Sequence, residues 1–273
     1  MSILKYNSGW IKSPKPNPAA RLRLFCFPYA GGGALTYRSW PEALPADVEV
    51  CPVQLPGHES RLHEPAFNQL GPLVDALVPE LLPLLDRPFA FFGHSMGAMI
   101  GFETARRLRA KKVVGPRHLF VSGRRAPHLP PKGERRTYDL PEAEFIEELG
   151  RLNGTPREVL EHPELLELVL PILRADFSIC QTYAYAPSEP LNIPITALGG
   201  ADDHDVGRAS LEEWREQTSD IFKLHMLPGD HFFIHSARAR VCHLLSDELN
   251  SLVRRSYHRV APSHLRVGAP PSL

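Results

Sequence analysis

Short apolar runs alternate with longer amphipathic stretches along the chain. The apolar runs are rich in Val, Ile, Leu and Phe and predict buried strands at residues 22–28, 48–55, 88–92, 118–122, 193–198 and 221–227. The stretches between them have helical periodicity at residues 70–85, 96–110, 211–218 and 236–254. This alternation predicts an α/β fold, with a mostly parallel sheet, helices on both faces and ligands beyond the carboxyl ends of the strands.

One connection is far longer than a compact crossover needs, because about 70 residues separate the fourth and fifth apolar runs. A Pro- and Arg-rich loop at 124–136 precedes helical patterns at 141–152 and 163–183. The second helix has an apolar stripe and is expected to kink at Pro171; the stripe consists of Leu165, Leu166, Val169, Ile172, Leu173 and Phe177. We therefore predict a helical lid, inserted at about 124–190, over the carboxyl-end face.

The domain organisation follows from where the periodicity ends. We expect one domain over residues 1–253, including the lid, and a flexible C-terminal tail over 254–273, where the apolar repeat is lost and the chain ends in GAPPSL. No internal repeat divides the chain.

Composition excludes several classes of protein. The 31 Lys+Arg residues balance 31 Asp+Glu residues, which excludes a uniformly basic nucleic-acid binder. A hydrophobic content of 43% excludes disorder of the whole chain, and no window approaches the roughly 18 apolar residues of a membrane span. The four cysteines are far apart and predict reduced core thiols in a cytoplasmic protein, without a disulfide framework or metal site; they are Cys26, Cys51, Cys180 and Cys242.

The strongest chemical signal is the pentapeptide GHSMG at residues 93–97, which follows a predicted strand and opens a predicted helix. In this context GxSxG is typical of a nucleophile elbow, a strained turn that lifts Ser95 Oγ out of the sheet. The backbone N–H of Met96 then lies at a helix N-terminus, where it can stabilise an oxyanion. We expect the side chain of His94 to point away from the nucleophile and to pack. The alternative is an ordinary glycine turn with a buried serine.

A serine in such a turn needs a histidine and an acid, which follow it in that fold in the order Ser, acid, His. The segment after the fifth apolar run contains Asp202, Asp203 and Asp205, which we rank in the order Asp203, Asp202, Asp205, because one loop presents one carboxylate inward. The segment after the sixth run contains His231, which we prefer to His235, one helical turn later.

The loop after the first strand, FPYAGGG at residues 27–33, is the candidate for a second oxyanion donor. Its glycines allow close approach of the backbone, and we select the N–H of Ala30. A phosphate-binding loop is excluded, because the chain has no GxxxxGK[ST] pattern there and no Lys follows the glycines.

Five segments together resemble the type II thioesterases that accompany modular polyketide synthases and nonribosomal peptide synthetases. They are FPYAGGGALTYRSW, VQLPGHESRLHEP, FFGHSMGA, LGGADDHDV and PGDHFFI, in this order between residues 27 and 234. The resemblance implies an α/β-hydrolase fold with a helical lid. It also implies that Ser95 is the nucleophile, His231 the base and Asp203 the orienting acid, with the Ala30 and Met96 amides as oxyanion hole. One departure is His58, where relatives often carry Arg.

The resemblance further implies hydrolysis of acyl thioesters held on the 4'-phosphopantetheine arm of a carrier protein, with no metal and no cofactor of the enzyme itself. An esterase or lipase acting on oxygen esters is the nearest alternative, although YAGG at residues 29–32 replaces its usual HGGG-type sequence. A chain-releasing thioesterase domain is another; a start at Met1 without a carrier-like segment favours a discrete protein. A non-enzymatic module is expected to lack at least one of Ser95, Asp203 and His231.

The balanced charge conceals two blocks of opposite sign. Residues 106–136 contain eleven basic side chains and one acid, whereas residues 137–186 contain ten acids and three arginines. One interpretation is a solvated helix face followed by an acidic lid surface. The other is that five side chains at the root of the lid dock an acidic carrier protein or its phosphate, namely Arg124, Arg125, Lys132, Arg135 and Arg136.

Overall fold

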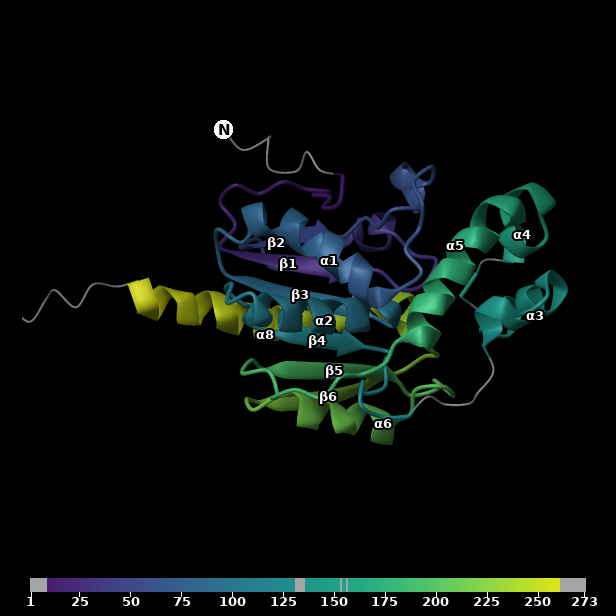
Figure 1. Cartoon of the computed structure of the whole chain (residues 1–273). Coiled ribbons are helices and arrows are strands. Elements are labelled where there is room, and N and C mark those ends of the chain that lie inside the picture. The colour runs from purple at the N-terminus through teal and green to yellow at the C-terminus, as the bar shows by residue number, and fades with distance from the viewer. Residues whose placement is uncertain (1–8, 131–135, 153, 156, 261–273) are drawn as a thin grey trace, which may run out of the picture.

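The computed structural model describes residues 9–130, 136–152, 154–155 and 157–260. In these residues six parallel strands form one sheet, in the order β2-β1-β3-β4-β5-β6 (Figure 1). The strands are β1 (Leu22–Phe27), β2 (Val48–Pro52), β3 (Phe89–His94), β4 (Leu119–Ser122), β5 (Ile195–Gly200) and β6 (Phe222–Leu227). Each strand overlaps one of the predicted apolar runs, and β3 and β5 extend two residues beyond theirs, so the predicted parallel α/β sheet is confirmed.

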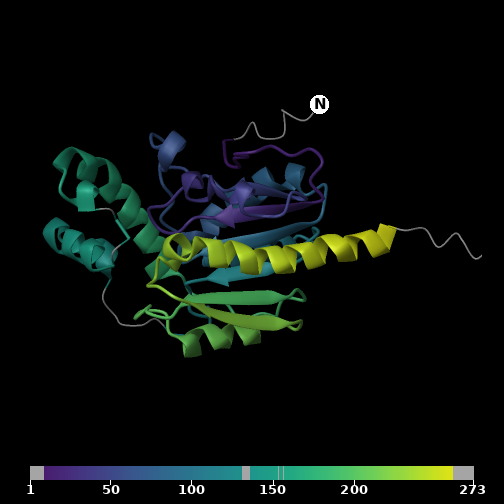
Figure 2. The same ribbon diagram turned by 180° about the vertical axis from the view of Figure 1, so that it is seen from behind.

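Alternation of side chains along the strands divides the core into two layers. Phe25 and Phe91 face one side of the sheet, and Leu24 and Phe92 face the other. The first layer is covered by α1 (Leu70–Leu81), η5 (Leu82–Leu84), α2 (Met96–Ala110), α6 (Arg208–Glu212) and η7 (Glu213–Gln217). The second is covered by η2 (Ala34–Tyr37), η3 (Trp40–Glu42), α7 (Phe233–Ser236) and α8 (Arg238–Val260). Figure 2 shows α8 crossing the face opposite α1 and α2.

The inserted segment forms a helical lid at the carboxyl-end edge of the sheet (Figure 1). Its elements are η6 (Thr137–Asp139), α3 (Glu142–Leu152), α4 (Arg157–Leu160) and α5 (Pro163–Thr182), and α5 continues through Pro171. The lid has a small core of its own, in which Phe145 and Leu149 of α3 meet Leu170 and Leu173 of α5. The predicted stripe is only partly buried, since Leu165 is 42% exposed.

The closing helix differs from the prediction. α8 continues to Val260, so residues 254–260 belong to a helix and not to the expected flexible tail. This end of α8 projects past the sheet (Figure 1), and a helix that covers no core needs no apolar stripe. The loss of apolar periodicity at residue 254 therefore does not mark the end of the helix, and the predicted boundary was wrong. The rest of the expected tail, residues 261–273, lies outside the described residues.

The sheet order determines where a site can form. β1 pairs with both β2 and β3, so the strand order reverses beside β1, and the residues Phe27 and Gly93 are register partners where β1 and β3 end. The loops after β1 and β3 therefore leave the same edge side by side, which is the usual place for ligands in such sheets. No helix in the described residues has the length and apolar content to cross a membrane.

Candidate active site

Ser95 occupies a sharp turn between β3 and α2. Its backbone has φ 52 and ψ −114, a conformation that is costly for a residue with a side chain. A Cβ on Gly93 would lie 2.1 Å from the carbonyl oxygen of Gly97, and a Cβ on Gly97 would lie 2.1 Å from that of Phe27. The two glycines are therefore required because β1, β3 and α2 approach each other closely at this turn.

Three side chains from separate loops form a continuous chain of hydrogen bonds. Ser95 Oγ lies 3.0 Å from His231 Nε2, and His231 Nδ1 lies 2.7 Å from Asp203 Oδ2. Ionised Asp203 only accepts, so the imidazole donates from Nδ1 and accepts the serine proton at Nε2. This is the tautomer that allows a histidine to act as a base toward serine.

The acid of this group is held in its charged form. The side chain of Asp203 is 1% exposed, and its other oxygen accepts the N–H groups of Asp205 and Val206 at 2.9 and 3.0 Å. Burial raises the pKa of Asp203, but the hydrogen bond and charge of His231 and the two backbone donors together bring it below its usual value. A negative charge therefore lies beside His231 at neutral pH and stabilises an imidazolium there.

The competing residues have other partners. Asp202 Oδ2 accepts the N–H of Gly229 at 3.2 Å, and Asp205 is exposed with its backbone N–H on Asp203. His235 Nε2 lies 3.0 Å from the hydroxyl of Tyr29. Of the three acids in this loop, the structure brings Asp203 to His231.

His94 is fully buried beneath the triad. Its Nδ1 lies 2.9 Å from Ser122 Oγ, and its ring centroid lies 5.3 Å from that of His231. Burial, with the nearby His231 and His235, holds the pKa of His94 well below its ordinary value, so the ring is neutral. Its contacts are those of a packing residue that supports the imidazole of His231.

The two candidate oxyanion donors have no competing acceptor. The backbone N–H groups of Ala30 and Met96 make no hydrogen bond to any described residue. Met96 is the first residue of α2, where N–H groups have no partner within the helix. Gly31, which follows Ala30, has φ 78, a value that glycine adopts without strain.

The sequence did not predict the roles of two buried residues near the candidate oxyanion loop, residues 27–33. Asp176 of α5 accepts a hydrogen bond from the backbone N–H of Gly31, and it also bonds to His58. The available signals were an acid on the apolar side of a lid helix, three residues after Leu173, and the departure at His58 itself. Neither signal specifies a partner, because the two residues are 118 positions apart.

The basic block is divided in space. Arg106, Arg107 and Arg109 lie at the end of α2, which at about 1.5 Å per residue is roughly 20 Å from Ser95, and they contact Glu103, Asp75 and the Pro190 carbonyl. At the root of the lid, Arg124 is half-buried and donates to the Cys180 carbonyl at 3.3 Å, Arg125 is half-buried and Arg136 is exposed. The other two predicted docking residues, Lys132 and Arg135, lie outside the described residues.

Among the described residues, one group could hold a cation, namely His128, Glu213 and Glu216. Gln217 Nε2 lies 3.0 Å from His128 Nδ1, which places the imidazole proton on Nε2, 3.4 and 3.3 Å from the two carboxylates. The three residues therefore already satisfy one another as a hydrogen-bonded group, apart from the Ser95 site.

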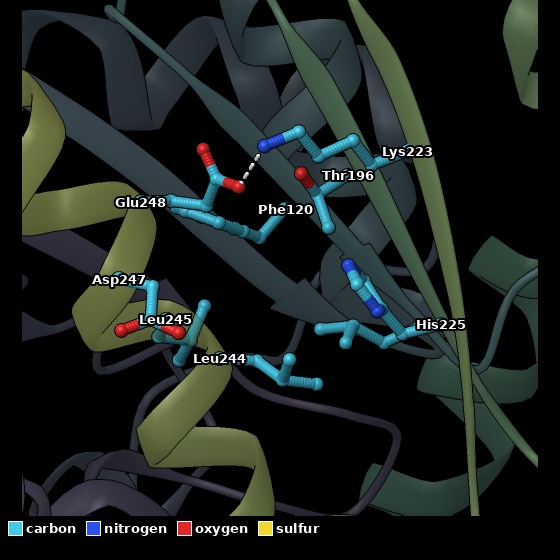
Figure 3. Close-up of a pocket in the computed structure, with 9 residues that line it drawn as sticks. Phe120, Thr196, Lys223, His225, Leu244, Leu245, Asp247 and Glu248 are labelled. Atoms are coloured by element: carbon cyan, nitrogen blue, oxygen red, sulfur yellow. Dashed lines mark hydrogen bonds and ion pairs between the residues drawn. The ribbon is translucent and has the colours of Figure 1, made fainter.

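A hollow of about 270 Å³ lies on the face of the sheet that α8 covers, between β5, β6 and α8 (Figure 3). Lys223 of β6 forms an ion pair across it with Glu248 of α8, while Thr196 and His225 line its wall. None of the triad residues lines it.

The fold and the site define a class of protein. A parallel sheet that presents a serine on a strained turn after β3, an acid after β5 and a histidine after β6 is the arrangement of α/β-hydrolases. The family model described as "Thioesterase domain" matches residues 22–249.

Individual relatives agree with the family model over most of the chain. Gramicidin S biosynthesis protein GrsT of Aneurinibacillus migulanus is 46% identical over 249 residues, which are 91% of this chain and 97% of that protein. A Brevibacillus parabrevis protein with the name linear gramicidin dehydrogenase LgrE is 49% identical over 89% of this chain and 94% of its own length. The structure of BorB, a type II thioesterase from the borrelidin biosynthetic cluster, matches with TM-score 0.80 and 35% identity, covering 88% of this chain and 97% of BorB. The chain belongs to the thioesterase family, and within it to the type II thioesterases of polyketide and nonribosomal peptide pathways.

Proposed function

We propose that this protein hydrolyses acyl thioesters carried on the 4'-phosphopantetheine arm of synthase carrier proteins, through an acyl-enzyme on Ser95. The observation that carries the proposal is the hydrogen-bonded chain Ser95–His231–Asp203, found in a member of the type II thioesterases. The similarity to proteins of gramicidin S and borrelidin biosynthesis supports a carrier-bound substrate.

The geometry suits a two-step acyl transfer. Ser95 Oγ attacks the thioester carbonyl while His231 Nε2 takes its proton, and the resulting oxyanion binds the N–H groups of Ala30 and Met96. The C–S bond then breaks, and His231 returns the proton to the departing pantetheine sulfur. Water attacks the acyl-serine with His231 again as base, which releases the carboxylic acid and regenerates Ser95. Asp203 stabilises the imidazolium in both steps.

The carrier protein is proposed to approach at the root of the lid. Carrier domains present an acidic surface and a phosphate on the arm, which cationic side chains attract. The side chains of Arg125 and Arg136 make no hydrogen bond or ion pair to another described residue. Arg124 contributes charge there although its guanidinium also contacts the lid helix.

The decisive experiment compares substrates. We expect acyl groups on a phosphopantetheinylated carrier to be hydrolysed with higher kcat/KM than simple oxygen esters. Ser95→Ala should abolish the activity, and Ser246→Ala, a serine that bonds within α8, should leave it unchanged. A preference for free oxygen esters, or undiminished activity in Ser95→Ala, would contradict the proposal.

A further inference from the structure

The lid helix α5 touches the candidate oxyanion loop directly. Asp176 Oδ2 accepts the backbone N–H of Gly31 at 2.7 Å, and this carboxylate is 1% exposed. One turn earlier, Leu173 packs so closely on the same residue that a Cβ on Gly31 would lie 2.6 Å from its Cδ2. Two residues of the lid therefore determine the position of the Gly31 peptide.

A buried histidine holds Asp176 in place. His58 Nε2 lies 2.9 Å from the same oxygen, Asp176 Oδ2, and His58 Nδ1 lies 2.9 Å from the carbonyl oxygen of Pro56. Both of these oxygens only accept, so both ring nitrogens carry protons and His58 is an imidazolium. Burial lowers the pKa of His58, but the charge and hydrogen bond of Asp176, the Pro56 carbonyl and Glu59 together raise it above its ordinary value.

The segment that carries His58 also holds the far end of the oxyanion loop. Gln54 Oε1 accepts the N–H of Ala34 at 3.3 Å, and Gln54 Nε2 donates to the His58 carbonyl at 2.8 Å. The Glu59 carboxylate accepts the N–H of Leu35 at 3.0 Å. Segment 54–59 thus holds the residues that directly follow the loop, the lid holds Gly31 within it, and the buried pair His58–Asp176 joins the two supports.

On the outer side, α5 and this segment separate. A groove of about 660 Å³ lies between them, lined by Gly57 and Ala66 on one wall and by Pro171 and Ala175 on the other. The buried pair therefore joins lid and body beside this groove, while further along α5 Ile179 packs into the main core.

We propose that Asp176 is a positioning residue for the oxyanion hole, held in place by His58, so that the hole is complete only when the lid is seated. The inference rests on the proposed Ser95 chemistry. Three consecutive glycines leave the loop many backbone conformations. The bond from Gly31 to Asp176, with the turn bond from the Gly32 N–H to the Tyr29 carbonyl at 2.9 Å, selects the one that directs the Ala30 N–H at the substrate oxygen. Because transition-state stabilisation requires donors that are already in place, a loosened loop lowers kcat rather than substrate affinity.

The first test replaces Asp176 and follows a small pantetheine thioester, so that carrier docking is not involved. Asp176→Ala should lower kcat by at least about tenfold, with KM within about threefold of the wild type. Binding of a trifluoromethyl ketone, whose adduct on Ser95 carries an oxyanion, should weaken by a similar factor. Asp176→Asn keeps an oxygen that accepts from Gly31 and should recover most of the kcat.

Two further variants separate positioning from stability. The double variant His58→Leu/Asp176→Leu replaces the buried ion pair by apolar groups, a change that proteins often tolerate. It should fold yet show the same loss of kcat as Asp176→Ala. The matched control is Tyr183→Phe, which removes a bond of 2.6 Å between Tyr183 at the end of the lid helix and Glu103 of α2 without touching the oxyanion loop. Its kcat should be unchanged.

The outcomes distinguish the two proposals. A folded double variant with wild-type kcat, or equal losses in Tyr183→Phe and Asp176→Ala, would overturn the role of Asp176, since the lid would then act only as a cover. If the wild type instead prefers oxygen esters, the proposed function fails. The same variants, assayed on the preferred ester and with the trifluoromethyl ketone, still decide the role of Asp176.

Discussion

At the scale of single residues, backbone segments approach each other closely at the nucleophile elbow, and this limits which residues can stand there. Gly97 lies against the backbone of β1, and a methyl group there would meet the Phe27 carbonyl oxygen at 2.1 Å. Main-chain atoms cannot move aside as the end of a flexible side chain can. The strained turn at Ser95 therefore requires glycine at both flanking positions. The GxSxG pattern is thus explained by contacts between three elements and not by the turn alone.

We expect Gly97→Ala to lower the free energy of unfolding by at least about 2 kcal/mol, because the new methyl group overlaps main-chain atoms. Urea denaturation measures this change. Gly115→Ala is the control, since a Cβ there meets nothing within 4 Å. Equal effects of the two substitutions would contradict the close contact between Gly97 and the Phe27 carbonyl.

The charge of Asp203 gives a second prediction at this scale. Asp203→Asn should reduce kcat by about 10³- to 10⁴-fold, because the amide no longer stabilises the imidazolium or its tautomer. Asp202→Asn, in the same loop, should change kcat little. Steady-state kinetics on a small thioester measures both, and the opposite ranking would assign the acid to Asp202.

The pH dependence of stability follows from the same residue. The folded pKa of Asp203 is lowered, so its ionised form adds stability above the unfolded value of about 3.9. That contribution is lost as the pH falls through the lowered pKa. Acid unfolding of Asp203→Asn should therefore depend less steeply on pH than that of the wild type, as measured by circular dichroism between about pH 5 and 2.

At the scale of elements, α3 and the first part of α5 form a separately packed unit, whereas the end of α5 joins the main core through Ile179. Phe145 of α3 is fully buried, lies 5.6 Å from the ring of Phe177, and has the guanidinium of Arg174 4.5 Å from its own centroid. This small cluster is distinct from the two large layers on the sheet. This part of the lid can therefore lose its packing without unfolding the sheet.

Phe145→Ala should remove about 3–5 kcal/mol of packing energy from this small core. Hydrogen exchange should then show loss of amide protection in α3 and α5, while β3 and α2 keep theirs. Leu165→Ala, at an exposed position of α5, is the control and should leave protection unchanged. Uniform loss of protection throughout the chain would show that lid and sheet unfold as one unit.

At the scale of the whole molecule, a net charge of zero coexists with a divided basic block. Arg106, Arg107 and Arg109 of that block lie at the far end of α2, whereas Arg124, Arg125 and Arg136 lie at the root of the lid, on the side of the active site. The proposed carrier docking therefore concerns the three described arginines at the root of the lid. Long-range attraction of this kind acts on association and is screened by salt.

The double variant Arg125→Glu/Arg136→Glu should raise KM for a carrier-bound substrate several-fold at low salt, and the effect should shrink at high salt. A small pantetheine thioester should be hydrolysed as before. Lys111→Glu reverses an exposed charge at the far end of α2 and should have no effect on either substrate. Equal losses on both substrates would argue against docking.

The amino-acid sequence by itself determined the strands, the main helices, the elbow at Ser95 and the chain order of acid and histidine. Periodicity and turn chemistry are properties of neighbouring residues, so they can be read without knowing the fold. Periodicity did not predict the last turns of α8, because the part of the helix that projects past the sheet has no apolar stripe.

Only the tertiary structure decided which carboxylate of one loop meets His231, how the basic block divides, and that Asp176 of the lid joins His58 and the oxyanion loop. Each of these depends on contacts between residues far apart in sequence, 28 positions for Asp203 and His231 and 118 for His58 and Asp176. A buried carboxylate finds its partner through the packing of whole elements, and no local pattern encodes that packing.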